Sequence, residues 1–191
     1  MKTIILIIVA YLLGSISPSI IQGKLKGIDI KKEGSGNAGS TNTLRVLGKK
    51  AALITLAVDI LKGFIAVKLG AFGGMTCAYL CAIAAFLGHI YPCYYGFKGG
   101  KGVATAAGVV LAINPLIALI CLVLVLIIVA ITRYVSLGSI SAAVLLIILC
   151  CISDRGFLPF ATIIAVIVIF KHRANIDRLI HHKENKISFK K

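Results

Sequence analysis

The segment 34–45, GSGNAGSTNTLR, gathers glycines, small polar residues and one arginine. The glycines let the backbone approach a ligand closely, and successive N–H groups in such a loop can form an anion-binding nest. Ser40, Thr41 or Asn42 can cap a following helix, which would bring a positive helix end to the same place. The alternative is a flexible polar connector, which this composition also fits. The candidate ligand-binding residues are Gly34, Ser35, Gly36, Asn37, Gly39, Thr41 and Arg45.

The segment 97–105, FKGGKGVAT, places two lysines in a glycine-rich turn directly before an apolar stretch. Backbone amides and cations at the start of a helix are suited to hold phosphate. The pattern is not a Walker loop, because Gly102 follows Lys101 where Ser or Thr is required. Alternatively, the lysines only mark the cytoplasmic side of a membrane. The candidate binding residues are Lys98, Gly99, Gly100, Lys101 and Gly102.

The segment 171–179, KHRANIDRL, follows the last apolar stretch. If it is helical, His172 and Asn175 share a face and can point into one cavity. His172 and Asp177 also match the H-x₄-D pattern of another acyltransferase class, but residues five apart on a helix diverge by about 140° and cannot readily form a dyad. The alternative is a solvated basic helix at the membrane surface.

Ser136 and Ser139 lie beside Arg133, where they can add hydroxyl donors to the same cavity or simply cap a helix. The sequence contains no G-x-S-x-G elbow and no metal-ligand pattern. The candidate residues are hydrogen-bond donors and cations, and no nucleophile stands out with a base beside it. This balance favours an anionic substrate whose reactive group arrives already activated.

The amino-acid composition indicates the kind of fold that places these segments. Of the 191 residues, 59% are apolar and 14% are charged, and the mean hydropathy is +1.02, whereas soluble domains average about 45–50% apolar and about 25% charged. The chain is therefore predicted to be an all-α integral membrane protein rather than a soluble enzyme or a disulfide scaffold. Asn114–Pro115 interrupts the apolar stretch 103–132, which would be about 45 Å long as one helix. The expected spans are 3–21, 51–69, 75–91, 103–113, 116–132, 137–152 and 157–170.

Charge distribution decides the topology. The chain has 21 Lys and Arg against 6 Asp and Glu. With seven spans, one face holds 23–50, 93–102, 133–136 and the tail from 171, which contain 17 of the 21 basic residues. The positive-inside rule then predicts seven transmembrane helices in one domain over 1–191, with the N-terminus outside and the C-terminus in the cytoplasm.

Two pairs inside the spans are expected to be structural. Asp59 and Lys62 lie three residues apart in the second span, where an ion pair is favoured over a substrate role because buried charges are costly when unpaired. Cys77 and Cys81 lie one helical turn apart and are expected to pack as small apolar side chains rather than to bind metal.

Three blocks resemble the bacterial acyl-phosphate:glycerol-3-phosphate acyltransferases, the PlsY family. They are GSGNAGSTNTLR at 34–45, GHIYPCYYGFKGGKGVAT at 88–105 and KHRANIDRLIHHKE at 171–184. The departures are Ser40 for the usual alanine, Tyr91 for phenylalanine, and His182 for a glycine close to Glu184.

The resemblance implies transfer of a fatty acyl group from acyl phosphate to the 1-hydroxyl of glycerol 3-phosphate. The products would be lysophosphatidic acid and inorganic phosphate, in the first step of phospholipid synthesis. It also implies a bacterial cytoplasmic membrane, a site on the cytoplasmic side and contact with membrane lipid. No cofactor, metal or nucleic acid is expected. The alternative is a transporter for a small phosphorylated anion, which is disfavoured because all three polar segments lie on one face.

As a hypothesis, the 34–45 segment and Lys101 hold the acyl-phosphate head. Lys101, Ser136 or Ser139, His172 and Asn175 then place glycerol 3-phosphate. The proton of the attacking hydroxyl goes to the substrate's own phosphate or to His172. The residues expected to be catalytic are Ser35, Arg45, Lys101, His172 and Asn175.

Overall fold

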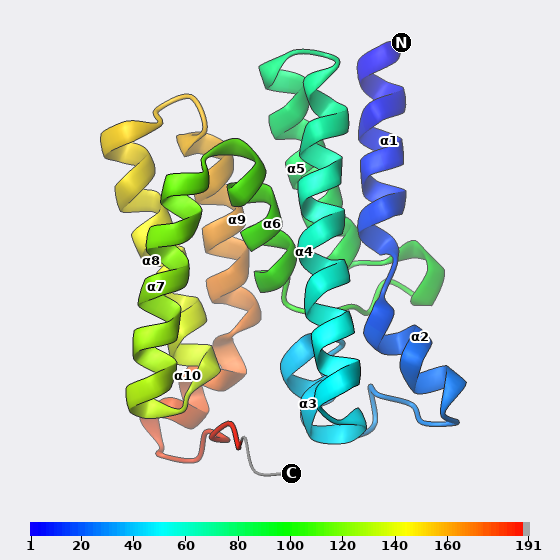
Figure 1. The fold of residues 1–191 in the computed structure, drawn as a ribbon, viewed down its shortest axis with the longest axis vertical. Coiled ribbons are helices and arrows are strands. Elements are labelled where there is room, and N and C mark those ends of the chain that lie inside the picture. Colours follow the sequence, from blue (N-terminus) through cyan, green and yellow to red (C-terminus); the bar gives the residue numbers. More distant parts are fainter. Residues whose placement is uncertain (189–191) are drawn as a thin grey trace. The chain divides into compact units, whose positions relative to one another are not determined.

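Every regular element in the described residues, 1–188, is a helix in the computed structural model, which confirms the all-α prediction for that part of the chain. The chain divides into two compact units, Met1–Ile113 and Asn114–Lys191. Figure 1 traces both units. Lys190 and Lys191, two of the basic residues counted for the tail, lie outside the described residues.

The first unit contains six α-helices and one short 3-10 helix. Helix α1 packs against α5 and α4, α6 packs against α4, and α3 packs against the start of α4. The elements are α1 (Lys2–Ser15), α2 (Pro18–Leu25), α3 (Ser40–Leu47), α4 (Lys49–Ala71), α5 (Met75–Ile90), η1 (Cys93–Tyr95) and α6 (Val103–Ile113).

Small residues let these helices approach closely, as is common between membrane helices. Gly14 of α1 lies against the backbone of Ala85 in α5, and a Cβ at Gly14 would collide with it. Cys77 and Cys81 are buried in the same apolar cluster as Ala85 and Ala10. The expectation that these cysteines serve packing is therefore confirmed.

The first expected span, 3–21, is not one straight helix. Helix α1 ends at Ser15, α2 begins at Pro18, and the two are bent by 40°. Ile16 and Ser17 adopt extended backbone conformations. The cause is local, because a proline disfavours the helical conformation of the residue before it and lacks an N–H group to continue the helix.

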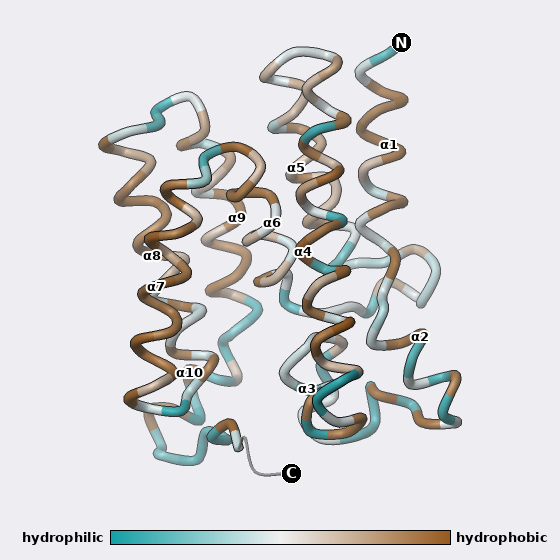
Figure 2. The backbone as a smooth tube through the Cα atoms, viewed as in Figure 1, coloured by the Kyte–Doolittle hydropathy of each residue, from teal (hydrophilic) through white to brown (hydrophobic). Residues whose placement is uncertain are grey.

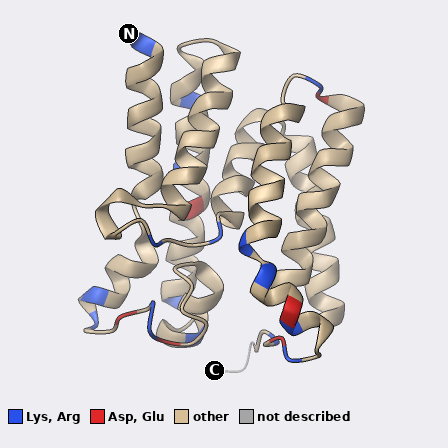
Figure 3. Cartoon of the chain, turned by 180° about the vertical axis from the view of Figure 1, so that it is seen from behind, with Lys and Arg blue, Asp and Glu red and all other residues tan. Residues whose placement is uncertain are grey.

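The second unit consists of α7 (Pro115–Thr132), α8 (Val135–Ser153), α9 (Leu158–Lys171) and α10 (Arg173–Ile180). Helix α8 packs against both α7 and α9. The expected break at Asn114–Pro115 is present, since the Asn114 side chain caps α7 by accepting a 3.2 Å hydrogen bond from the Ile117 N–H. In Figure 3, basic residues gather around α10, and the loop between α8 and α9 lies at the other end of this unit. That loop contains Asp154 and Arg155.

Several helices have the length and composition to cross a membrane. Three qualify alone, at Met75–Tyr95, Pro115–Thr132 and Val135–Ser153, and five qualify if each of the bent pairs α1–α2 and α9–α10 is one span. Helix α6 is apolar but shorter. Figure 2 shows the apolar character of α7 along its whole length, and its leucines and isoleucines are largely exposed, as a helix surface facing lipid requires.

Candidate active site

The loop before α3 is organised by one buried side chain. Asn42 is 1% exposed, and its Oδ1 accepts a 2.8 Å hydrogen bond from the Ser35 N–H. Its Nδ2 donates to the carbonyl oxygens of Ile30 and Glu33, at 3.1 and 3.0 Å. These hydrogen bonds give the segment a defined turn, which favours an ordered loop over a flexible connector.

The sequence predicted a different role for Asn42. Ser40, Thr41 and Asn42 were expected to supply a helix cap, and this is wrong because they form the first turn of α3 and no side chain caps it. Gly39 is the N-cap residue instead. The first N–H groups of a helix have no intrahelical acceptor, so this end of α3 is suited to an anion.

The other candidates of this segment lie before α3 or in its first turn, except Arg45, which lies at the other end of the helix. Gly34 and Gly36 have φ values of 59° and 69°, which glycine adopts without strain. The Gly36 and Gly39 N–H groups donate to carbonyls within the loop. Ser35 is exposed, Asn37 and Thr41 are half-buried, and Arg45 lies exposed in the last turn of α3. These positions were the expected binding residues of the first segment.

The second glycine-rich loop folds back onto the end of α5. The Gly99 N–H donates to the Ile90 carbonyl at 3.0 Å, and the Gly100 N–H donates to the His89 carbonyl at 3.2 Å. Gly102, with φ of 84°, leads directly into α6 at Val103. A glycine-rich turn does open this helix, as expected from the sequence.

The two loops touch each other. A Cβ at Gly100 would lie only 2.6 Å from the carbonyl oxygen of Ala38. Segments more than 60 positions apart are therefore in direct contact within the first unit, with Lys98 exposed and Lys101 half-buried beside the contact. The arrangement can surround an anion with backbone amides and cations.

Electrostatics around this contact are positive. The Lys31 Nζ donates a 3.0 Å hydrogen bond to the Tyr95 carbonyl. Burial lowers the pKa of the Lys31 ammonium group, and although Asp29 opposes this effect, Lys98 and Lys24 lower that pKa further. Lys24 and Lys98 are thus close enough to Lys31 to add positive charge beside it.

In the second unit, a carboxylate collects three donors. The Glu184 Oε1 accepts hydrogen bonds from Ser136 Oγ at 2.8 Å and from Asn175 Nδ2 at 2.6 Å, and the Oε2 pairs with Arg178 Nε at 2.7 Å. Burial alone would raise the pKa of Glu184, but hydrogen bonds from Asn175, Arg178 and Ser136 hold it below its ordinary value. Glu184 was not among the expected site residues, and it links two that were.

The turn at His182 brings Glu184 into this position. His182 has φ of 56°, and the Lys183 N–H donates to the Arg178 carbonyl at 2.7 Å, which ends α10 and redirects the chain. A left-handed residue at a helix end is most often glycine. The glycine usual at this position in the resembling family suits that conformation, and His182 adopts it as well.

The two serines of α8 differ. Neither caps the helix, which corrects that alternative, because its N-cap residue is Tyr134 and no side chain caps it. Ser139 donates a 2.8 Å hydrogen bond to the Val135 carbonyl one turn earlier. Ser136 instead reaches Glu184 and, through it, Asn175.

His172 lies where the chain bends by 55° between α9 and α10, so the two segments are not one continuous helix. The ring is 3% exposed, and its Nδ1 lies 2.7 Å from the Val168 carbonyl. A carbonyl can only accept, so Nδ1 carries the hydrogen and Nε2 is the basic nitrogen of the neutral ring. Asp177 is exposed, and its Oδ1 lies 3.3 Å from His181 Nδ1.

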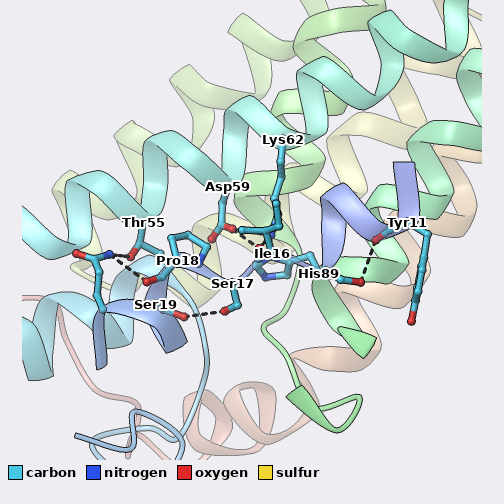
Figure 4. A network of polar contacts seen from close by, with 11 residues as sticks. Tyr11, Ile16, Ser17, Pro18, Ser19, Thr55, Asp59, Lys62 and His89 are labelled. Carbon is cyan, nitrogen blue, oxygen red and sulfur yellow. Dashed lines mark hydrogen bonds and ion pairs between the residues drawn. The ribbon is translucent and has the colours of Figure 1, made fainter. Parts of the chain in front are cut away.

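Asp59 and Lys62 form the expected ion pair, with 2.8 Å between Oδ1 and Nζ. The pair does not stand alone, because Lys62 Nζ also lies 3.0 Å from His89 Nδ1 and donates a 2.7 Å hydrogen bond to the Ile16 carbonyl. Figure 4 shows these groups converging from α4, α5 and the break between α1 and α2. His89 was not among the expected site residues, although it lies within the second block of the resemblance.

A family model described as glycerol-3-phosphate acyltransferase matches residues 4–182. The chain belongs to the glycerol-3-phosphate acyltransferase family. It is 46% identical over 197 residues to the glycerol-3-phosphate acyltransferase of Clostridioides difficile strain 630, covering 98% of this chain and 97% of the relative. It is 45% identical over 194 residues to the protein of the same name from Thermoanaerobacter sp. strain X514, covering 100% of this chain and 98% of the relative.

Two solved structures of a glycerol 3-phosphate acyltransferase are similar to the chain. The chain superposes with a TM-score of 0.93 and 40% identity on the crystal structure of PlsY, an integral membrane glycerol 3-phosphate acyltransferase, in its glycerol 3-phosphate form. The lysophosphatidic acid form of PlsY gives a TM-score of 0.90. Each match covers 98% of this chain and 96% of PlsY. The comparisons confirm the resemblance, the all-helical integral membrane fold and the prediction that the chain is an acyltransferase.

Proposed function

We propose that this acyltransferase moves a fatty acyl group from acyl phosphate to the 1-hydroxyl of glycerol 3-phosphate, as the first step of phospholipid synthesis. The observation that carries the proposal is the contact of the two glycine-rich loops at Gly100 and Ala38, in a chain of this family. Both substrates bear phosphate, and this contact combines a helix start, a glycine-rich turn and cations on one anion-binding surface.

The reaction requires no nucleophile from the protein. The 1-hydroxyl oxygen attacks the acyl carbonyl carbon, the bond from that carbon to the phosphate oxygen breaks, and phosphate leaves with the electron pair. Because acyl phosphate is a mixed anhydride with a good leaving group, orientation of the two substrates accounts for much of the rate, and effective molarity can supply about 7–11 kcal/mol. Donors aimed at the developing negative charge supply the rest.

In the first unit, the proposal assigns the acyl-phosphate head to the start of α3 and the 98–102 loop. The amides of the first α3 turn face the anion, and Arg45 and Lys101 neutralise its charge. Positive φ at Gly34, Gly36 and Gly102 supports this role, since these turns bring backbone rather than side chains to the anion.

In the second unit, the proposal assigns glycerol 3-phosphate to Ser136, His172 and Asn175. The hydrogen bonds favour Ser136 over Ser139, because the Ser139 hydroxyl is used within its own helix whereas Ser136 joins the Glu184 cluster. The His172 ring presents Nε2 as its basic nitrogen, so it can accept the proton of the attacking hydroxyl. The departing phosphate is the other acceptor, and it needs no protein base.

We also propose the topology that the charges predict: seven spans in one domain, an outside N-terminus, a cytoplasmic C-terminus and a bacterial cytoplasmic membrane. Support comes from the concentration of basic residues near α2, α3 and α10. In a cysteine-free variant of the chain, Arg155→Cys should react with a membrane-impermeant thiol reagent added outside intact cells, and Lys50→Cys should react only after the cells are opened. The reverse pattern would overturn the orientation.

The direct experiment supplies the purified protein in lipid with acyl phosphate and glycerol 3-phosphate and follows phosphate release and lysophosphatidic acid formation. Both products should appear in equal amounts and should require both substrates. If sealed vesicles containing the protein accumulate labelled glycerol 3-phosphate while no phosphate is released, the protein is a transporter and the proposal fails.

A further inference from the structure

A buried charge cluster lies behind the 98–102 loop, formed by Asp59, Lys62 and His89. These residues are 1%, 3% and 5% exposed. The Lys62 Nζ donates a 2.7 Å hydrogen bond to the Ile16 carbonyl, lies 3.0 Å from His89 Nδ1, and forms an ion pair with Asp59 Oδ1 at 2.8 Å. One side chain of α4 thereby ties together the α1–α2 break and α5 (Figure 4).

The Lys62 contact also orients the His89 ring. The Lys62 Nζ lies 3.0 Å from Nδ1, which holds that nitrogen on the Lys62 side of the ring. Asp59 Oδ1 is more distant from Nδ1, at 3.3 Å, and its charge is balanced by Lys62. The ring therefore has one orientation, with Nε2 on the side away from Lys62.

The loop rests on that side of the ring. The nearest atom that a Cβ at Gly100 would meet is His89 Nε2, followed by the Ala38 carbonyl oxygen at 2.6 Å. The Gly100 N–H additionally donates to the His89 carbonyl. His89 thus supports Gly100 with both its side chain and its backbone, at the point where the two glycine-rich loops touch.

We propose that Lys62, Asp59 and His89 are positioning residues that set the place of the 98–102 loop and thereby the binding of a phosphate-bearing substrate. The ion pair holds the imidazole, the imidazole supports Gly100, and Gly100 fixes the loop that carries Lys98 and Lys101. This inference rests on the proposed phosphate-binding role of that loop. A structural ion pair alone would contribute to folding and leave the KM for substrate unchanged.

The test separates positioning from stability. Removing one partner of a buried ion pair leaves an uncompensated charge and destabilises the fold, whereas neutralising both can leave stability nearly unchanged. The variant is therefore Asp59→Asn/Lys62→Met, with Lys68→Met as the matched control. Lys68 is another lysine of α4, and its Nζ donates to the Ala112 carbonyl and has no contact with His89 among the described interactions.

The expected result for the double variant is a folded protein whose melting temperature falls only modestly because the Ile16 carbonyl loses its donor, kcat within about threefold, and a KM for a phosphate-bearing substrate raised about tenfold or more. Tenfold corresponds to about 1.4 kcal/mol. His89→Gln keeps a polar side chain and provides a second variant if the first does not fold, and it should show the same KM-selective defect. Lys68→Met should match the wild type.

Unchanged KM for both substrates in a folded double variant, or in His89→Gln, would overturn the inference. If the variant has a lower melting temperature and a lower kcat but an unchanged KM, the cluster contributes to folding alone. These outcomes differ from failure of the proposed function, in which wild-type protein itself releases no phosphate, or Lys101→Ala keeps the wild-type KM and kcat.

Discussion

The Asn175 side chain donates a 2.6 Å hydrogen bond to the Glu184 carboxylate, nine residues further along the chain. Because an ionised carboxylate only accepts hydrogen bonds, this contact fixes which end of the Asn175 amide faces Glu184. The Asn175 carbonyl oxygen is directed elsewhere. A tail residue thus determines the orientation of a side chain assigned to substrate.

Replacing Glu184 by Gln should therefore damage catalysis without removing any group assigned to substrate. The neutral amide loses the charge-assisted bonds from Asn175 and Arg178, each worth about 1.5–3 kcal/mol. We expect kcat/KM to fall roughly ten- to hundredfold. Steady-state phosphate release measures this, and Asp177→Asn, at an exposed acid of α10, is the control. Wild-type kcat/KM in Glu184→Gln would contradict the prediction.

The same carboxyl group predicts a pH dependence of stability. The pKa of Glu184 is lower in the folded protein than its ordinary value of 4.5, so the unfolded chain binds the proton more readily. The stability it contributes is present above about pH 4.5 and is lost as pH falls through the lower folded value. Melting temperatures from pH 7 to pH 3 should show the wild type losing its advantage over Glu184→Gln only in the acidic range. A constant difference across that range would contradict this.

Alanine substitutions at the two serines of α8 should have different effects on the KM for glycerol 3-phosphate. Ser136→Ala removes a donor to Glu184 and a group assigned to glycerol 3-phosphate, so we expect the KM for glycerol 3-phosphate to rise about tenfold. Ser139→Ala removes only a hydrogen bond to the Val135 carbonyl within the helix and should leave that KM within about twofold. Equal effects of the two changes would show that Ser136 has no special role.

Gly100→Ala should be among the most damaging small substitutions in the chain. The added methyl group would meet the His89 ring and the Ala38 carbonyl, and such overpacking costs about 1–3 kcal/mol. Turnover should fall by at least tenfold, since the two loops are pushed apart. Gly96→Ala is the control, because its methyl group meets no atom within 4 Å and carries only the strain of a φ of 65°.

Removing either cation assigned to the phosphates should nearly abolish turnover. Arg45→Ala and Lys101→Ala each delete a charge that stabilises the transition state, an effect of about 10²–10³ in kcat for comparable donors. Cys77→Ala, in the apolar cluster of the first unit, should leave kcat nearly unchanged. Phosphate release by all three variants in the same lipid provides the measurement. A fully active Lys101→Ala would remove the second loop from the site.

Local sequence signals predicted the local features well. Asn114–Pro115 predicted a helix break, the spacing of Asp59 and Lys62 predicted an ion pair, and the run before Val103 predicted a glycine-rich turn opening a helix. Each depends on residues within a few positions of one another, where backbone preferences and helix geometry decide the outcome.

Long-range contacts were missed for a physical reason. The sequence gives no sign that Glu184 would reach Ser136, 48 positions away, or that Asn42 would turn back to the 30–35 loop rather than cap its own helix. These contacts depend on how helices pack and on the left-handed turn at His182. Pro18 carried a usable signal for the break after Ser15, which the expected span 3–21 left out of account.

The hydrogen bond from Lys62 to the Ile16 carbonyl joins two features that are each unfavourable by themselves. An interrupted helix leaves a carbonyl without its usual partner, and an ammonium group enclosed by helices lacks hydration. The ammonium group donates to the free carbonyl, and the carbonyl replaces part of the lost hydration. We therefore expect that a related protein that lacks one of these two features also lacks the other. Residues 16–18 and position 62 should therefore change together during evolution, or stay unaltered together.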